Sequence, residues 1–366
     1  MKIMKNNIFL SYLEVKYLFK QKFLWLLLLI GFAIIVYRMP KFNYEMNYHI
    51  FEESKQEQSY ESMSESERLI VDYWNEKKTY IETHRLEIYE QASKKKEILE
   101  ERIGFEYEYL TKIENLFSKT IDLDVQDYLG WEIFFLHQTS MSPHSPVCLL
   151  EMVLIVSAGL LLFTKDKENN TLFWASITGR GATFASYVLK IIIVIFYAIF
   201  IQVLFNGIYI IGLGLVCGLD MRHWFNLIQN IPQYGMCDVQ FNIFGTIVID
   251  ILLKCLLCLI ILMGILVFSQ ILRKYLFMFM SILGVSGILY YWLYVMCQRN
   301  SYGMWWYINP FSIFQLDKIL TYDAICIMNH AVDVRVIMGG TWLGILTVLS
   351  IVSYQVWRKY INVSSS

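Results

Sequence analysis

Six long apolar stretches are the feature that most limits what this chain can fold into. They cover residues 20–38, 147–164, 187–213, 244–271, 275–297 and 336–357. A helix needs roughly 20 apolar residues to cross the hydrocarbon core of a bilayer. Because only helices and closed barrels satisfy their backbone hydrogen bonds there, the sequence predicts an all-α integral membrane protein with six transmembrane helices.

The composition agrees with this prediction. Of 366 residues, 56% are hydrophobic and 17% are charged, whereas a soluble domain has about 45–50% apolar and roughly 25% charged residues. The charges are also unevenly placed. Residues 44–140 hold 22 of the 32 acids and 11 of the 31 basic residues, so this part has a net charge of −11 and the remainder +10.

Lysine and arginine in the short loops orient the spans. Basic residues precede the first span, lie between the second and third, form the Arg273-Lys274 turn and follow the sixth span. The alternate loops are poor in them, since residues 214–243 hold only Arg222. Positive loops remain in the cytoplasm. We therefore expect both termini, including the tail 358–366, in the cytoplasm, and three segments outside: 39–146, 214–243 and 298–335.

Residues 39–146 are predicted to form a helical domain outside the membrane. Apolar residues between Ile70 and Phe117 recur at spacings of three and four, with Glu and Lys between them. This pattern is typical of a coiled-coil-like helical hairpin, with breaks expected near Ser93–Lys96 and Gly104. An acidic outer surface would attract cationic ligands. A purely structural, solvated domain is the simpler alternative.

Two segments are expected to lie in the membrane interface. Residues 1–19 precede the first span, and Ile8, Tyr12, Val15 and Phe19 share one helical face. This arrangement predicts a cytoplasmic amphipathic helix, the alternative being an extension of the first transmembrane helix. Residues 131–135, Trp-Glu-Ile-Phe-Phe, return the chain to the membrane and are expected to form an aromatic anchor.

The loop 165–186 is the largest segment expected to face the cytoplasm. Thr171 is suited to cap a short helix that carries Leu172, Phe173 and Trp174, and glycines on both sides of Arg180 would end it. Such a helix is a candidate docking element, and an ordinary solvated loop is the alternative. The chain contains no GxxxxGK[ST] phosphate loop, so we expect no nucleotide hydrolysis by that route.

Polar residues inside the spans are few and are functional candidates. They are Glu151 in the second span, Gln202 and Asn206 in the third, and Asp250 and Lys254 in the fourth. Each also has a structural explanation. Glu151 and Asp250 could extend to the outer interface, Asp250 and Lys254 could neutralise each other at i, i+4, and the two amides could join helices by hydrogen bonds.

The order of these elements resembles the membrane subunit of a type-2 ABC exporter, the ABC-2 permease class. In that family an interfacial elbow helix precedes six spans, and a cytoplasmic coupling helix joins the second and third. Several residues match its coupling segment: Phe163, Lys165, Lys167, Glu168, Thr171, Leu172 and, at the start of the third span, Lys190. Residues 307–311, Tyr-Ile-Asn-Pro-Phe, are similar to its proline-containing outer stretch. The cluster after the coupling helix has Ser176, Gly179 and Arg180 but lacks the usual proline.

This resemblance implies a permease in a bacterial cell membrane that works with a separate cytoplasmic ABC ATPase, which binds ATP and Mg²⁺. It also implies a second permease copy or paralogue, because one six-span chain makes half a pathway in that family. Glu168, Phe173 and Trp174 would contact the ATPase. The expected substrate is an amphipathic peptide, antibiotic or lipid-like molecule, and neither a nucleic-acid partner nor a cofactor or metal of the chain's own is expected.

Two other functions remain open at this point. A sensory or scaffold protein would bind a cationic ligand through the acidic outer domain. A membrane-embedded enzyme would need converging catalytic residues, yet the six histidines are isolated and no DxxxD or HExxH motif occurs. The cysteines give no metal site. Cys255 and Cys258 are expected to be small core residues, and Cys217 and Cys237 could form a disulfide in one outer loop.

Overall fold

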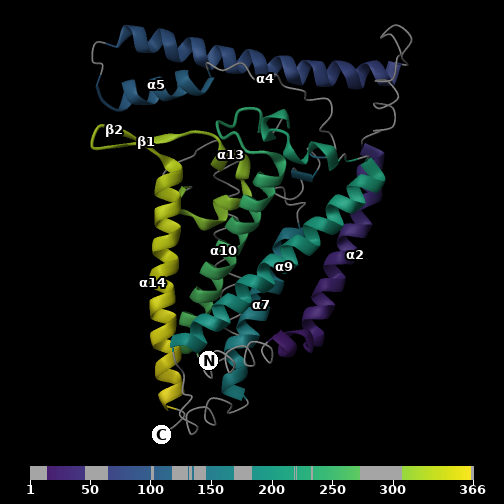
Figure 1. Cartoon of the computed structure of the whole chain (residues 1–366), viewed down its shortest axis with the longest axis vertical. Coiled ribbons are helices and arrows are strands. Elements are labelled where there is room, and N and C mark those ends of the chain that lie inside the picture. The colour runs from purple at the N-terminus through teal and green to yellow at the C-terminus, as the bar shows by residue number, and fades with distance from the viewer. Residues whose placement is uncertain are drawn as a thin grey trace.

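The described part of the chain is mostly helical (Figure 1). The computed structural model describes residues 15–45, 65–99, 103–117, 131, 134–135, 146–168, 184–217, 219, 221–231, 234–272 and 307–363. Three helices, α9 (Phe184–Cys217), α10 (Ile243–Leu272) and α14 (Val334–Val363), are long and apolar enough to cross a membrane. They coincide with the predicted spans 187–213, 244–271 and 336–357. The predicted span 275–297 lies outside the described residues.

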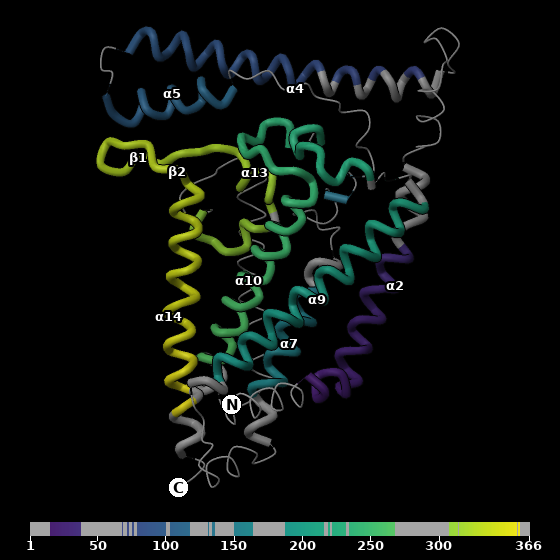
Figure 2. Tube along the Cα trace, viewed as in Figure 1, coloured from purple at the N-terminus to yellow at the C-terminus, as the bar shows by residue number. Residues whose placement is uncertain are grey.

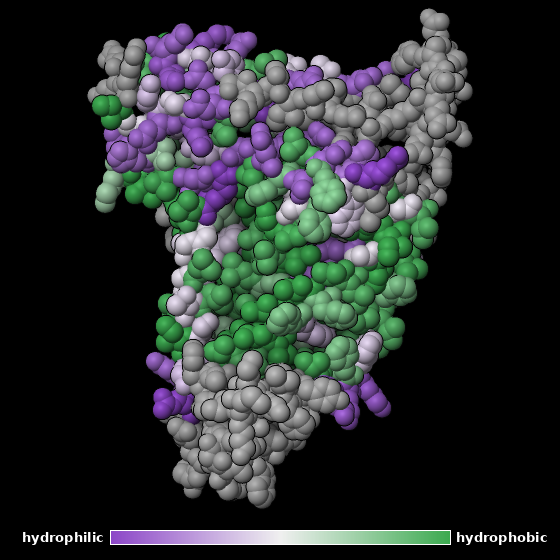
Figure 3. All heavy atoms as spheres, viewed as in Figure 1, coloured by the Kyte–Doolittle hydropathy of each residue, from purple (hydrophilic) through white to green (hydrophobic). Residues whose placement is uncertain are grey.

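Two further helices fall on the remaining predicted spans. These are α2 (Lys22–Glu45) and α7 (Pro146–Glu168), whose described apolar stretches, Lys22–Tyr37 and Leu150–Phe163, are shorter. Figure 3 shows a broad apolar band across the middle of the molecule, below a hydrophilic end. A continuous apolar surface of this kind suits contact with lipid, and it gives the chain the character of a membrane protein.

These five helices pack side by side. α2 contacts α7 and α9, and α10 contacts α7, α9 and α14 (Figure 2). Their contact surfaces form one continuous apolar core that includes Leu154, Ile201 and Leu257. Gly31 lets α2 approach α9 closely, because a Cβ at this position would clash with the ring of Phe205.

A helical hairpin lies across one end of the bundle (Figure 1). It consists of α4 (Glu65–Ile98) and α5 (Phe105–Phe117). The break predicted near Gly104 is confirmed, and its φ of +116° is a conformation that favours glycine. The break predicted near Ser93–Lys96 is wrong. There α4 continues because Ala92 is buried and the Lys96 ammonium donates to the Glu114 carboxylate at 2.6 Å.

The prediction of an all-α fold is wrong in one place. Residues Ala324–Ile327 (β1) and His330–Asp333 (β2) pair as an antiparallel hairpin, with Ile327 opposite His330. The connecting residues Met328 and Asn329 have φ values of 51° and 66°. Positive φ at both central residues matches the twist of a two-residue hairpin turn. The hairpin is short and its turn lacks the usual Asn-Gly signal, so hydropathy alone does not reveal it.

The helical hairpin is attached to the bundle through residues distant in the sequence. Arg85 in α4 donates to the Gly235 carbonyl at 2.7 Å. In α5, the Tyr109 ring stacks on Tyr322 with centroids 5.9 Å apart. The acidic domain is therefore docked on one end of the bundle, which we call the hairpin end.

The residues expected to anchor the chain in the membrane interface are instead part of the core. Trp131, Phe134 and Phe135 are all buried. Trp131 meets Trp224 edge to face at 5.8 Å, and Phe135 meets Tyr234 in the same way at 5.2 Å. The interfacial prediction for this segment is wrong because these rings find aromatic partners within the protein, and this packing is favourable beyond simple burial.

The opposite end of the bundle contains the start of α2. Residues 15–19 are helical, the chain turns at Lys20–Gln21, and α2 begins at Lys22. The described part of the predicted interfacial helix is therefore not a continuous extension of α2. Residues 1–14 lie outside the described residues.

Candidate functional site

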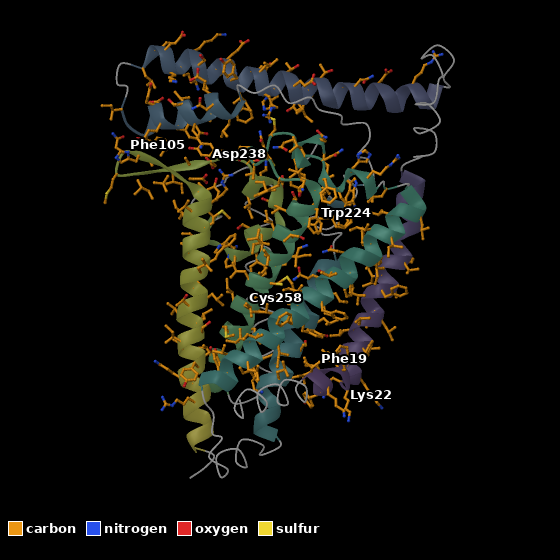
Figure 4. The ribbon with its side chains drawn as sticks, in the orientation of Figure 1. Phe19, Lys22, Phe105, Trp224, Asp238 and Cys258 are labelled. Atoms are coloured by element: carbon orange, nitrogen blue, oxygen red, sulfur yellow. The ribbon has the colours of Figure 1, made fainter. Side chains whose placement is uncertain are left out.

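The five polar residues predicted inside the spans are all buried, and they come from three helices that pack on one another. Glu151 belongs to α7, Gln202 and Asn206 to α9, and Asp250 and Lys254 to α10. We call these five residues the polar cluster. Cys258, labelled in Figure 4, lies one turn along α10 from Lys254.

Charge in the cluster is partly compensated. The Lys254 ammonium donates to an Asp250 carboxylate oxygen at 2.6 Å, and both side chains are at most 5% exposed. Glu151 lies within electrostatic range of both of these charges. The cluster thus combines two acids and one base, all of them buried.

Four oxygen atoms of the cluster have no hydrogen-bond donor among the residues that the structure describes. They belong to the side chains of Glu151, Gln202, Asn206 and Asp250. The Gln202 amide nitrogen is better placed, since it donates to the Cys255 sulfur at 3.5 Å. A buried acceptor without a donor costs about 1–3 kcal/mol. The cluster therefore favours an incoming group that donates hydrogen bonds or carries positive charge.

The structure distinguishes between the alternatives for these residues. Glu151 and Asp250 do not extend to an interface, because they are only 2% and 4% exposed. Asp250 and Lys254 do pair with each other. Within the described residues, no group of three or more His, Cys, Asp or Glu side chains is placed to hold a metal ion.

A second set of contacts joins the helices at the end opposite the hairpin. The buried ammonium of Lys190, near the start of α9, donates to the Leu162 carbonyl of α7 at 2.6 Å. Tyr187 is hydrogen-bonded to Ser353 of α14. These contacts fix the helix ends on both sides of the predicted coupling loop.

The loop itself lies largely outside the described residues. α7 ends at Glu168, whose side chain is not described. The other predicted coupling residues lie outside the described part of the chain. They are Thr171, Leu172, Phe173, Trp174 and Arg180. Their roles stay predictions.

A charged network at the hairpin end was not predicted. Arg335, near the start of α14, donates to both carboxylate oxygens of Asp238 at 3.0 Å and also to Asp333. Asp333 in addition accepts the Arg335 backbone N–H at 2.9 Å and so caps α14. Figure 4 places Asp238 beneath the helical hairpin of α4 and α5. The sequence Asp-Val-Arg at the start of the last span could have indicated the pair of Asp333 and Arg335. It could not indicate the pair with Asp238, because that residue is distant in the sequence.

The same region holds α5 in place. A Glu108 carboxylate oxygen accepts from the Ala331 backbone N–H at 2.8 Å, and the other lies 2.9 Å from His330. The backbone hydrogen bond, followed by the hydrogen bond from His330, lowers the pKa of Glu108. This residue was not singled out from the sequence because nothing local distinguishes it from the other acids of its segment.

Three of the described thiols are buried in the core, whereas that of Cys326 is exposed. Cys255 and Cys258 are buried thiols outside any disulfide, as expected. Cys237 is also a free thiol, so the pairing considered with Cys217 is not formed. Its sulfur lies near the Asp317 carbonyl and the Thr321 hydroxyl, and burial raises the pKa of the Cys237 thiol.

Comparison with known proteins adds no assignment to this geometry. No protein-family model, curated protein or solved structure matches the chain.

Proposed function

We propose that the chain is the transmembrane permease subunit of an ATP-driven exporter, working with a separate cytoplasmic ATPase that binds ATP and Mg²⁺. The observation that carries this proposal is the hydrogen bond from Lys190 to the Leu162 carbonyl. It joins the two helices that lead into and out of the loop 165–186. A push on that loop by a partner would therefore reach α7 and α9 together.

That movement would act on the polar cluster, because its residues belong to the helices that move and to the helix against which they move. α7 carries Glu151 and α9 carries Gln202 and Asn206, whereas Asp250 and Lys254 stand on α10. A shift of α7 and α9 against α10 would separate these groups and open a polar surface within the membrane. The oxygens without donors would then receive a positively charged or donor-rich part of an amphipathic peptide, antibiotic or lipid-like substrate.

The proposed topology has six crossings of a bacterial cell membrane, both termini in the cytoplasm and the acidic hairpin outside. Two observations support it. α10 ends at Leu272, far from the helical hairpin (Figure 2). The next described residue, Tyr307, is hydrogen-bonded to Asp323, which immediately precedes β1 at the hairpin end. A crossing within residues 273–306 accounts for this change of end. Lys22 lies away from the helical hairpin (Figure 4), and so does the end of α14, which carries Arg358 (Figure 1). The positive-inside rule expects cytoplasm at that end.

The test is a pull-down of the tagged full-length chain in mild detergent from the cell that naturally makes it, with ATPase activity measured in the eluate. The loop variant carries Glu168→Ala, Phe173→Ala and Trp174→Ala. We expect an ATPase to accompany the wild-type chain and to be lost from this variant. A second tagged copy in the same eluate would support a permease pair.

A matched control carries the same kind of change on the exposed face of α4: Glu90→Ala, Tyr80→Ala and Leu86→Ala. All three side chains are exposed, so this variant should retain the ATPase. If neither the wild-type chain nor the control brings down nucleotide-hydrolysing activity, the exporter proposal is wrong.

A sensory or scaffold role is the second candidate, and the charged network favours it. Arg335 links Asp238 and Asp333 at the point where α14 begins, and the hairpin rests beside it through Glu108 and Ala331. A cationic ligand bound by the acidic hairpin could therefore change the position of α14. Ligand binding without any transport, in membranes that contain the intact chain, would favour this role over export.

A further inference from the structure

An apolar pocket of about 90 Å³ lies between the turn before α2, α2 itself and α9. Its lining comes from side chains of all three parts, among them Leu18, Phe19, Trp25, Leu28, Phe200 and Leu204. Every one of these side chains is apolar or aromatic. The pocket therefore suits a hydrocarbon group, since a polar ligand would lose its hydrogen bonds to water on entry.

The rim of the pocket lies at the surface of the bundle. The Trp25 indole N–H donates to the Phe19 carbonyl at 2.7 Å, which closes the turn between residues 15–19 and α2. Phe19, Trp25 and Phe200 are 48%, 47% and 49% exposed. The pocket therefore communicates with the surface that lipid covers in a membrane protein.

Positive charge stands directly beside this rim. Lys20 follows Phe19 in the sequence, Lys22 precedes Trp25 by one helical turn, and both are exposed. Figure 4 places Phe19 and Lys22 together at the lower end of α2. Residues 15–37 contain no Asp or Glu, so no acid in this stretch offsets the two lysines.

We propose that this pocket binds one anionic phospholipid of the bilayer, with part of an acyl chain in the pocket and the phosphate at Lys20 and Lys22. An apolar slot beside two exposed lysines matches the two ends of such a molecule. Free phosphate would find only the lysines, and a neutral lipid only the slot. The bound lipid would brace the turn before α2 against α9. The site is independent of the proposed export function.

The test uses tryptophan fluorescence of the purified full-length chain in mild detergent, without any ATPase partner. Phosphatidylglycerol with brominated acyl chains quenches nearby indoles and is compared with brominated phosphatidylcholine. The Trp25→Phe variant isolates the signal of Trp25. We expect phosphatidylglycerol to quench Trp25 at concentrations on the order of tenfold lower than phosphatidylcholine, from the attraction of basic residues to anionic lipid.

Two pairs of variants examine the two halves of the site. Lys20→Gln with Lys22→Gln should abolish the preference for phosphatidylglycerol, whereas Arg358→Gln, which removes an exposed base at the end of α14, should preserve it. Leu204→Phe should fill the pocket and reduce quenching of Trp25 by both lipids. Val203→Phe, a neighbouring position that is 54% exposed, should not.

Two results would overturn the proposal. Equal quenching of Trp25 by the two lipids in the wild-type chain would mean that the lysines do not select a phosphate. Absence of quenching by either lipid would mean that something else fills the pocket, such as residues 1–14 of the chain itself.

Discussion

Replacing Lys254 by Met is the change whose effect the structure predicts most directly. The substitution keeps the length of the side chain but removes the charge that faces Asp250. Asp250 is 4% exposed as a whole residue, and one of its carboxylate oxygens already has no donor among the described residues. Removing one partner of a buried ion pair costs about 3–5 kcal/mol, because the remaining charge has neither water nor a counter-ion.

The chain provides a matched control in α4. Glu90 and Lys94 also stand at i, i+4, but their side chains are 62% and 71% exposed, whereas those of Asp250 and Lys254 are 5% and 3% exposed. Exposed helix pairs contribute at most about 0.5 kcal/mol. Lys94→Met should therefore leave stability nearly unchanged, although it removes the same charge at the same spacing.

The assay is the midpoint of thermal unfolding of the full-length chain in detergent, at neutral pH. Lys254→Met should lower the midpoint by several degrees, and Lys94→Met by little or nothing. Adding Asp250→Asn to Lys254→Met should recover much of the loss, because residue 250 then carries no charge that needs the Lys254 ammonium. If Lys254→Met and Lys94→Met lower the midpoint equally, Asp250 is not shielded from water as the structure requires.

Three further outcomes are expected. Gly31→Ala should destabilise the chain by about 1–3 kcal/mol, because its Cβ would clash with the Phe205 ring; the thermal midpoint measures this loss. Maleimide at neutral pH should label the exposed Cys326 but not Cys237, which is buried and whose pKa is raised by that burial; peptide mass spectrometry distinguishes them. The protection factors of the α5 amides, which correct for the slower intrinsic exchange in acid, should fall as the pH drops through the folded pKa of Glu108. That pKa is lowered in the folded chain, so the stability that Glu108 contributes is present above its unfolded pKa and is lost in acid.

Each of these outcomes has its own control. A Cβ at Gly207 in α9 would meet no atom within 4 Å, so Gly207→Ala should be neutral or slightly stabilising. Glu108→Gln should remove the acid-dependent loss of protection in α5. Labelling of Cys237 as fast as Cys326 in the native chain would contradict its burial.

Periodicity and hydropathy predicted the elements that depend on local sequence. A helix in lipid satisfies its own backbone, so a long apolar stretch suffices to place α9, α10 and α14. The spacing of apolar residues similarly predicted the hairpin of α4 and α5, and Gly104 marked its turn because few other residues adopt that φ. The exposed or buried state of Ser93–Lys96 could not be predicted, because it depends on the partner helix.

The polar cluster shows where local pattern stops being sufficient. The sequence identified all five of its residues, since polar groups are rare in apolar spans. It did not place Glu151 beside Asp250 and Lys254. α9 and α10 are apolar on nearly all sides, so no face of either helix is marked as the one that meets a neighbour. Which polar groups meet depends on how each helix rotates about its axis, and packing decides that rotation.

The sequence by itself determined that this chain is helical, apolar and suited to a membrane, and which of its residues are out of place there. Only the tertiary structure decided that Arg335 joins Asp238, that Trp131 packs inside rather than at an interface, and that β1 and β2 interrupt an otherwise helical chain. The physical reason is the distance along the sequence between the interacting residues. Helix formation is governed by neighbours a few residues apart, whereas these contacts join groups brought together only when the helices pack.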